Sequence, residues 1–299
     1  MNASENEEIK LSIVIAAWNG VTLLRQCLAS LERQADKIGI EVIVVSNFPV
    51  PADEFALTAK FLLLPETATV PELRSRGIGL CGGKVIALLE DHCIFDSNWC
   101  REIKKAHEST DAAIGGSVEN ATVEKALDWA VYFYDYGKYM LPNPAGAADS
   151  LSGINTSYKH ANLDEIAEVY RDGFFESSVN EELKKRGHQL TMLPSAIVYH
   201  NKSYELKRAA QHSYHLARSY AAKRVSTVSI SRRILFTVFS LILPVLLPLR
   251  IILTTIKKGR NIVPMIRALP FIILLMLIWS YGEFCGYLLG EGKSAGEWR

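Results

Sequence analysis

The sequence of 299 residues predicts an α/β fold, with a mostly parallel sheet followed by membrane-associated helices. Two observations predict the sheet. Short apolar, β-branched runs recur along the first part of the chain, and segments with helical spacing of leucines separate them. A third observation, the nearly charge-free runs after residue 229, predicts the membrane-associated helices.

Four predicted strands alternate with helices in the first part of the chain. These strands are LSIVIAA (11–17), IEVIVVS (40–46), KFLLL (60–64) and KVIALLE (84–90). Leucines at helical spacing indicate a helix over 20–34, and a second helix over 70–83 has Pro71 near its start and glycines at its end. Strands that alternate with helices form parallel sheets covered on both faces, so ligands are expected beyond the carboxyl ends of the strands.

Polar side chains stand where three of these strands end. They belong to Ala17-Trp18-Asn19, Ser46-Asn47 and Glu90-Asp91-His92. An acidic pair and a histidine at the end of an apolar strand cost desolvation free energy unless they are paired or used. The sequence therefore predicts a binding site at this edge of the sheet.

The next part, residues 111–228, mixes a strand (111–120), an aromatic stretch (128–142), a loop (142–153) and a helix (177–187). Long loops in a compact domain are typical of binding surfaces. We expect three parts: residues 1–110, residues 111–228 with an interfacial helix, and a membrane-anchoring helical hairpin at 229–299.

Two apolar runs characterise the last part, residues 234–249 and 268–290. The second is long enough to span a bilayer. The first contains Pro244 and Pro248 and meets Arg250, so residues 234–256 either span the membrane or form a re-entrant or interfacial segment. The basic stretch 207–224, with aromatic residues interleaved, predicts a helix on an anionic membrane surface.

Composition excludes several classes of protein. Lysine and arginine total 33 against 32 acidic residues, and no nucleic-acid-binding motif is present, so we expect no nucleic-acid partner. Five cysteines without a C-x-x-C pair suit reduced thiols in the cytosol. Cys93 and Cys100 beside His92 lack zinc-site spacing. Residues 1–10 are polar and acidic, which predicts no signal peptide.

Four segments carry a resemblance to a known family, in the family's order. They are LSIVIAAWNG (11–20), ELRSRGIGLCGGKVIALLEDH (72–92), SGINTSYKH (152–160) and FFESSVNEELKKRG (174–187). From about residue 11 to about residue 225 the chain resembles family 2 glycosyltransferases. The resemblance implies the GT-A fold, a Rossmann-like fold of nucleotide-diphospho-sugar transferases. It also implies that residues 1–110 are the nucleotide-sugar-binding half of this domain and residues 111–228 the acceptor-binding half.

The resemblance implies roles for the residues of the donor site. Glu90-Asp91-His92 falls on the family's D-x-D position, which binds the divalent ion under the diphosphate, and here it departs from that pattern. Depending on a one-residue choice of register, the ligand of Mn²⁺ or Mg²⁺ is Asp91 or His92. Asp91 is the first choice, because hard cations prefer carboxylate oxygens, and His92 is the expected second contributor. Arg74, and near it Arg76, resembles the family's basic residues near the pyrophosphate.

The same resemblance places further donor groups. Trp18 stands at the family's aromatic position after the first strand, beside Ala17 and Asn19; a packed turn aromatic is an equally good interpretation. Ser46-Asn47 replaces the usual acidic pair that contacts the base or ribose, and both side chains can still hydrogen-bond a nucleotide.

The acceptor side includes the expected general base. Glu176 falls on the second acid of the family's E-D element, which deprotonates the acceptor hydroxyl and gives inversion at the anomeric carbon. Glu181 and Glu182 compete for this role but fit a solvated helix face better. Asn155 of SGINTSYKH is the expected acceptor-binding residue, and His200 an additional metal ligand.

These residues predict a membrane-anchored, metal-dependent, inverting glycosyltransferase of the inner membrane, with its catalytic domain in the cytoplasm and a role in polysaccharide biosynthesis. The expected donor is a UDP sugar and the acceptor a hydroxyl of a glycan or a lipid-linked molecule. One alternative transfers the sugar to a polyprenyl phosphate, which is already ionised and needs no base. Another is a sugar-nucleotide-binding membrane protein without turnover.

Overall fold

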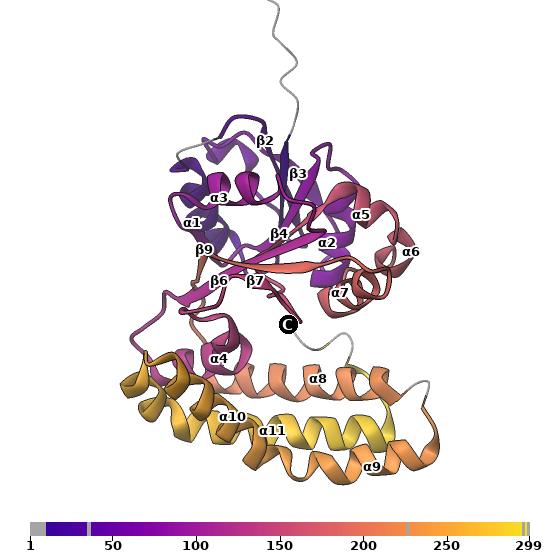
Figure 1. The fold of residues 1–299 in the computed structure, drawn as a ribbon. Helices are drawn as coiled ribbons and strands as arrows, with labels where there is room; N and C mark the ends of the chain where they lie inside the picture. Colours follow the sequence, from indigo (N-terminus) through magenta and orange to yellow (C-terminus); the bar gives the residue numbers. More distant parts are fainter. Residues whose placement is uncertain (1–9, 35–36, 226–227, 295–296, 298–299) are drawn as a thin grey trace, which may run out of the picture. The chain divides into compact units, whose positions relative to one another are not determined.

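The computed structural model describes residues 10–34, 37–225, 228–294 and 297, and the chain divides into two compact units (Figure 1). The first unit comprises Met1–Ala121 and Tyr139–Asn201. The second comprises Thr122–Lys138 and Lys202–Arg299. The three functional parts expected from the sequence remain a prediction.

A nine-stranded sheet with the order β3-β2-β1-β4-β8-β6-β9-β5 runs through the first unit, and β7 pairs with β9. Its strands are β1 (Leu11–Ala17), β2 (Ile40–Ser46), β3 (Lys60–Leu63), β4 (Val85–Glu90), β5 (Cys93–Phe95), β6 (Ala113–Asn120), β7 (Gly146–Ala147), β8 (Thr156–Lys159) and β9 (Leu190–His200). All seven residues of β1 are buried, as expected for a central strand with both faces covered.

The four strands predicted first are confirmed as the parallel part of the sheet. β1 lies between β2 and β4, and β3 pairs with β2, all in parallel. Parallel pairing brings the carboxyl ends of β1, β2 and β4 to one edge. The second part is mixed, because β8 runs antiparallel to both β4 and β6, whereas β9 is parallel to β6. A mostly parallel sheet therefore describes the first part better than the second.

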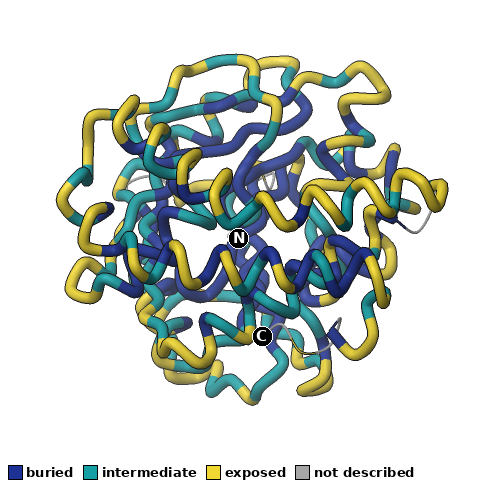
Figure 2. Tube along the Cα trace, turned by 90° about the horizontal axis from the view of Figure 1, so that it is seen from below, coloured by how far each residue is buried: buried dark blue, intermediate teal, exposed yellow. Residues whose placement is uncertain are grey.

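Helices connect the strands of the first unit. Figure 2 shows that short buried and exposed stretches follow one another along the chain as a whole. The helices of the first unit are α1 (Val21–Glu32), η1 (Ala52–Glu54), α2 (Val70–Ile78), α3 (Trp99–Ala106), α5 (His160–Asp164), α6 (Ala167–Tyr170) and α7 (Glu176–Lys185), and η2 (Gly137–Tyr139) stands at the point of the chain where the second unit gives way to the first. The helices predicted over 20–34, 70–83 and 177–187 are confirmed as α1, α2 and α7, each shorter than its predicted range.

The second unit is helical. Its helices are α4 (Ala126–Asp135), α8 (Leu206–Val225), α9 (Ile230–Ser240), α10 (Leu243–Lys258) and α11 (Ile262–Leu289). The predicted aromatic stretch forms α4, which packs against α11 through the rings of Tyr134 and Trp279, 5.9 Å apart. Residues 122–138 thus fold with the C-terminal helices, a long-range pairing with no local sequence signal.

Gly116 of β6 provides a stability prediction. A Cβ at this position would lie 2.0 Å from the carbonyl oxygen of Ala196 and 2.3 Å from Asn155 Nδ2. Because both neighbours are fixed in the sheet, Gly116→Ala is expected to destabilise the protein by about 1–3 kcal/mol or more, through overpacking. Urea denaturation measures this change. Gly79→Ala is the control, since its nearest neighbour would be 3.6 Å away, and an equal loss there would contradict the packing argument.

Candidate functional site

The site begins where β4 ends beside the turn that follows β1. Asp91 Oδ2 accepts hydrogen bonds from the backbone N–H groups of Trp18 (2.9 Å) and Asn19 (2.7 Å). Its Oδ1 accepts one from Asn19 Nδ2 at 2.6 Å. Asp91 is fully buried, so these donors replace its hydration. The carboxylate therefore fixes the β1–α1 turn at the edge of the sheet.

Strand pairing explains why these segments meet. Ala16 of β1 stands opposite Glu90 of β4, and the N–H of Asp91 continues the ladder to the carbonyl of Ala16 at 3.2 Å. Gly20 then begins α1 with φ 101°, a left-handed value that favours glycine. The polar residues predicted after β1 and β4 thus share one location because both strands end there.

Glu90 faces a different set of partners. Its Oε2 accepts a hydrogen bond from Trp18 Nε1 at 3.0 Å, and its Oε1 accepts one from Arg74 Nη2 at 2.7 Å. The indole of Trp18 is thereby tied to the acidic pair, which gives the predicted aromatic position a defined polar contact. The hydrogen bond between this carboxylate and the guanidinium joins two oppositely charged groups, which makes it stronger than a bond between neutral groups.

Arg74 connects the donor side of the site to the expected base. Its Nη1 donates to Glu176 Oε2 at 3.1 Å, and its Nη2 donates also to the carbonyl of Gly153 at 2.7 Å. The side chain of Arg74 is only 6% exposed, against 11% for Glu90 and 30% for Glu176. One nearly buried cation therefore holds two carboxylates that come from distant parts of the sequence.

Local structure positions this arginine. Thr69 and Glu72 form a capping box at the start of α2, and Pro71 occupies its first turn. Arg74 and Arg76 are two residues apart, so they point to nearly opposite sides of the helix. Arg76 is exposed, and within the described residues it is Arg74 that makes the ion pairs with Glu90 and Glu176.

Glu176 is in the first turn of α7, where the helix dipole favours a negative charge. Gly153 lies against it: a Cβ there would be 2.9 Å from Glu176 Cδ. Glycine at 153 leaves room for the carboxylate, and its carbonyl accepts from Arg74. Gly153 was not predicted as a site residue, although it belongs to SGINTSYKH (152–160), one of the four segments that carry the family resemblance.

The two predicted histidines meet beside the acidic pair. The rings of His92 and His200 are 4.8 Å apart in an edge-on arrangement, and both are buried. His92 Nδ1 lies 3.3 Å from Asn19 Nδ2, 3.6 Å from Glu90 Oε2 and 3.8 Å from Asp91 Oδ1. His92 is therefore in the site, and His200 lies behind it.

The cysteines near the site are thiols. Burial raises the pKa of Cys27 well above its ordinary value, and the charges of Cys93 and Asp91 add to the rise. Burial likewise raises the pKa of Cys93. The thiolate is the form that binds metals, so neither is suited to be a ligand. Within the described parts of the chain no group of three His, Cys, Asp or Glu side chains could hold a metal ion.

The remaining predicted residues have structural contacts. Ser46 Oγ donates to the carbonyl of Phe48 at 2.8 Å. Asn47 Nδ2 donates to the carbonyls of Glu66 at 3.3 Å and Ala68 at 3.1 Å, which fixes the loop before α2. Their contact with a nucleotide stays a prediction.

Asn155 is fully buried behind the site. Its Nδ2 donates to the carbonyls of Ser117 and Ala196, both at 2.9 Å, and its Oδ1 accepts from Trp99 Nε1 at 2.9 Å. These bonds tie the approach to β8 to β6 and β9, and no described contact links Asn155 to Arg74 or Glu176. Its acceptor-binding role stays a prediction.

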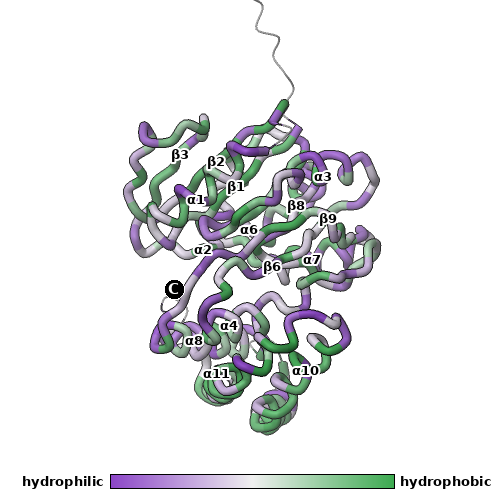
Figure 3. The backbone as a smooth tube through the Cα atoms, turned by 90° about the vertical axis from the view of Figure 1, so that its left-hand side faces the viewer, coloured by the Kyte–Doolittle hydropathy of each residue, from purple (hydrophilic) through white to green (hydrophobic). Residues whose placement is uncertain are grey.

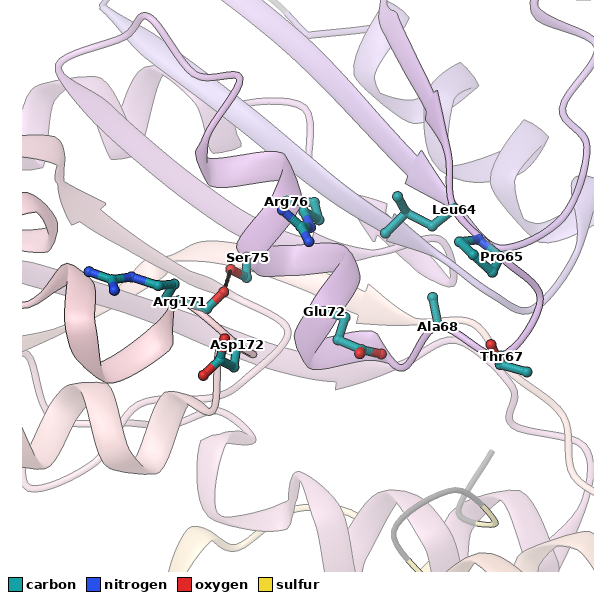
Figure 4. A pocket seen from close by; sticks show the side chains of 9 residues that line it. All are labelled: Leu64, Pro65, Thr67, Ala68, Glu72, Ser75, Arg76, Arg171 and Asp172. Atoms are coloured by element: carbon teal, nitrogen blue, oxygen red, sulfur yellow. Dashed lines mark hydrogen bonds between the residues drawn. The ribbon is translucent and has the colours of Figure 1, made fainter.

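A pocket of about 320 Å³ lies on the side of α2 that carries Arg76 (Figure 4). It is lined by Leu64, Pro65, Thr67, Ala68, Glu72, Ser75, Arg76, Arg171 and Asp172. Ser75 Oγ donates to the carbonyl of Arg171 at 3.0 Å across it. The loop held by Asn47 forms one wall, so this pocket adjoins the predicted nucleotide edge.

A comparison with known proteins identifies a family whose model matches this chain. The family model described as "Glycosyl transferase family 2" matches residues 12–166, about half of the chain. "Putative glycosyltransferase EpsH" of Bacillus subtilis (strain 168) is 27% identical over 138 residues, which are 44% of this chain and 36% of that protein. The aligned region thus spans about a third of that relative's length.

Two solved structures share the fold. S. aureus TarS 1-349 has a TM-score of 0.50 at 13% identity, over 94% of this chain and 90% of that one. The mannosyltransferase PcManGT from Pyrobaculum calidifontis, in complex with GDP-Man and Mn²⁺, has a TM-score of 0.51 at 12% identity, over 96% and 86%. At these identities the likeness concerns the fold alone, and it confirms the predicted GT-A fold.

Proposed function

This chain belongs to glycosyltransferase family 2, and we propose that it moves a sugar from a nucleotide sugar to an acceptor hydroxyl, with Glu176 as the general base. The observation that carries the proposal is the placement of Arg74 between Glu90 and Glu176. It joins the acidic pair at the end of β4 to a partly exposed carboxylate, which a hydroxyl can reach.

The proposed reaction uses these groups in sequence. Glu176 takes the proton of the acceptor hydroxyl, and the resulting oxygen nucleophile attacks the anomeric carbon. The bond from that carbon to the diphosphate breaks, and the nucleoside diphosphate leaves. Attack from the face opposite the leaving group inverts the anomeric configuration. The guanidinium of Arg74 orients Glu176 and places a positive charge near the leaving diphosphate.

A divalent cation, Mn²⁺ or Mg²⁺, is proposed to bind together with the donor. Asp91 Oδ1 and His92 Nδ1, 3.8 Å apart, are the two side-chain ligands that the site offers. Such ions commonly take one or two protein ligands and complete their shell with substrate phosphates and water. When bound, the ion would offset the charge that develops on the diphosphate. The Mn²⁺ present in the PcManGT complex supports this proposal by analogy of fold.

The donor and the acceptor are proposed more specifically as a UDP sugar and a glycan or lipid-linked hydroxyl. A lipid-linked acceptor suits an enzyme whose second unit carries apolar helices. Of the described helices, one is long and apolar enough to cross a membrane, α11, and the bent pair α9 and α10 passes the same test together. We propose an inner-membrane location with the first unit in the cytoplasm.

Release of nucleotide from UDP, GDP and dTDP sugars by the full chain tests donor and metal together. We expect one nucleotide to be released with Mn²⁺ or Mg²⁺, and the release to stop in EDTA and return with excess metal. For half-maximal release, His92→Ala is expected to require a Mn²⁺ concentration at least about tenfold higher than the parent, since the substitution removes one of the two proposed ligands. If release in EDTA equalled release with added Mn²⁺ or Mg²⁺, the proposed role of the metal would be wrong. No release and no transfer from any donor, with retained binding, would favour the binding-protein alternative.

A further inference from the structure

The second unit exposes an unusual amount of apolar surface. Large apolar side chains of α9, α10 and the turn between them face outward, and we call this surface the insertion face. Its members include Val238, Leu241, Val245, Leu246, Leu249 and Leu253, which are 47% to 68% exposed. Contiguous apolar surface of this kind marks an interaction site on a soluble protein. Figure 3 shows α10 and α11 predominantly in the colour of hydrophobic residues.

Most of the charged residues in the helices α8 to α11 are basic. From Leu206 to Gly282 the chain contains twelve Lys or Arg residues and no Asp or Glu. Basic residues next to exposed apolar helices attract anionic lipid head groups. The charge therefore identifies the occupant of the insertion face as an anionic bilayer rather than an apolar face of another protein.

Helix α11 is long enough to span a membrane, but α8 packs against it. A Cβ at Gly282 would lie 2.5 Å from the carbonyl oxygen of Tyr214, and one at Gly286 would lie 2.4 Å from that of Arg218. Equal four-residue steps on both helices mean that they run parallel in register. The two glycines let the helix backbones approach closely.

A buried polar cluster fastens this pair. Glu283 of α11 accepts hydrogen bonds from Trp279 Nε1 at 2.8 Å and from the Tyr287 hydroxyl at 2.7 Å. Arg224 of α8 lies 3.5 Å from the same carboxylate. Pulling α11 away from α8 would leave Glu283 without its cation, so the two helices are expected to move as one body.

The register between α8 and α11 limits how much of α11 could cross a bilayer without α8. Because Tyr214 stands beside Gly282, Leu206 at the start of α8 falls beside residue 274. Only residues 262–273 of α11 precede that point, and twelve helical residues span about 18 Å, against about 30 Å for the hydrocarbon core. Crossing would therefore draw α8 into the bilayer with Lys207, Arg208 and Lys223, which are exposed.

The pair α9 and α10 also departs from a straight span. Their axes bend by 64° at the break between them. Arg250 is exposed near the middle of α10, where a crossing helix would place it in the hydrocarbon core. In a helix that lies along the surface, the same side chain reaches the head groups while its stem packs on lipid.

We propose that the second unit lies in the plane of an anionic membrane, with the insertion face in one leaflet, and that α11 does not cross the bilayer. Of the alternatives that the sequence left open for residues 234–256, this proposal takes the interfacial one, and it extends it to the run 268–290, which is long enough to span. The proposal concerns the second unit alone and does not depend on sugar transfer.

Flotation of the full chain with preformed vesicles tests the partner. We expect binding to vesicles of phosphatidylcholine with phosphatidylglycerol at least tenfold stronger than to phosphatidylcholine alone. Val245→Glu with Leu246→Glu should abolish flotation without altering circular dichroism, because both side chains are exposed. Leu80→Glu, an exposed apolar residue of the first unit, is the matched control and should float normally. Equal binding by all variants, or binding to neither vesicle, would overturn the proposal.

Cysteine labelling tests the crossing. In a Cys81→Ser background, Arg260→Cys lies before α11 and Lys293→Cys lies after it; the other native thiols are buried. The protein is added to sealed anionic vesicles and treated with a membrane-impermeant maleimide. We expect both positions to react to the same extent before lysis. If one position reacts only after detergent, α11 crosses the bilayer and the proposal is wrong.

Discussion

Replacing Glu176 with Gln is expected to lower kcat of sugar transfer to a hydroxyl acceptor by about 10²–10⁴-fold, the usual contribution of a positioned general base. The amide can still accept a hydrogen bond from Arg74, so the site should keep its shape, but it cannot take a proton. The measurement is steady-state transfer with the donor identified by the nucleotide-release assay. KM for the donor should change little, because Glu176 acts on the acceptor.

Glu181→Gln is the matched control, since it lies on the same helix and pairs only with exposed Lys185, at 3.0 Å. It should retain full activity. Near-full activity of Glu176→Gln as well would contradict the role of the base. That outcome would point to an acceptor that is already ionised, such as a polyprenyl phosphate, and would leave the family assignment intact.

Arg74→Leu is expected to destabilise the protein by about 3–5 kcal/mol, because it removes the guanidinium that pairs with the buried carboxylate of Glu90. Arg74 forms ion pairs with both Glu90 (2.7 Å) and Glu176 (3.1 Å). Urea denaturation of the full chain, followed by tryptophan fluorescence, measures the loss. Activity should fall as well, since Glu176 loses its orienting donor.

Two variants separate this effect from a general loss of packing. Arg76→Leu, two residues along the same helix but exposed, should change stability by less than about 0.5 kcal/mol. Arg74→Leu combined with Glu90→Leu should recover part of the loss, because it removes the unpaired charge. If Arg74→Leu proved as stable as the parent, the buried pair would contribute nothing and the proposed bridge would be wrong.

Local pattern predicted the elements of the first unit well. β1 and β2 have the predicted bounds, and β3 and β4 differ by one residue at one end, because apolar β-branched runs and capping residues are short-range signals. The gathering of Trp18, Asn19 and Asp91 was also predictable, since parallel strands end at one edge. The GT-A fold followed from four ordered motifs and is confirmed by comparison.

Other features depended on contacts between distant residues. Arg74 and Glu176 are 102 positions apart, and no spacing rule indicates that one guanidinium holds both Glu176 and Glu90. The motif favoured Arg74 over Arg76, and the fold shows the contacts that Arg74 makes with Glu90 and Glu176. Asn155 matched a motif as a ligand-binding residue, whereas the structure shows it hydrogen-bonded inside the sheet.

By itself the sequence determined the four parallel strands, the helices α1, α2 and α7, the family and the edge of the sheet where the site lies, because periodicity, caps and ordered motifs are local. Only the tertiary structure decided which charges share Arg74, that residues 122–138 fold with the C-terminal helices, and that α8 runs beside α11. The physical reason is that burial, pairing and helix register are properties of surfaces in contact. Residues far apart in the chain meet there, and their spacing in the sequence does not record it.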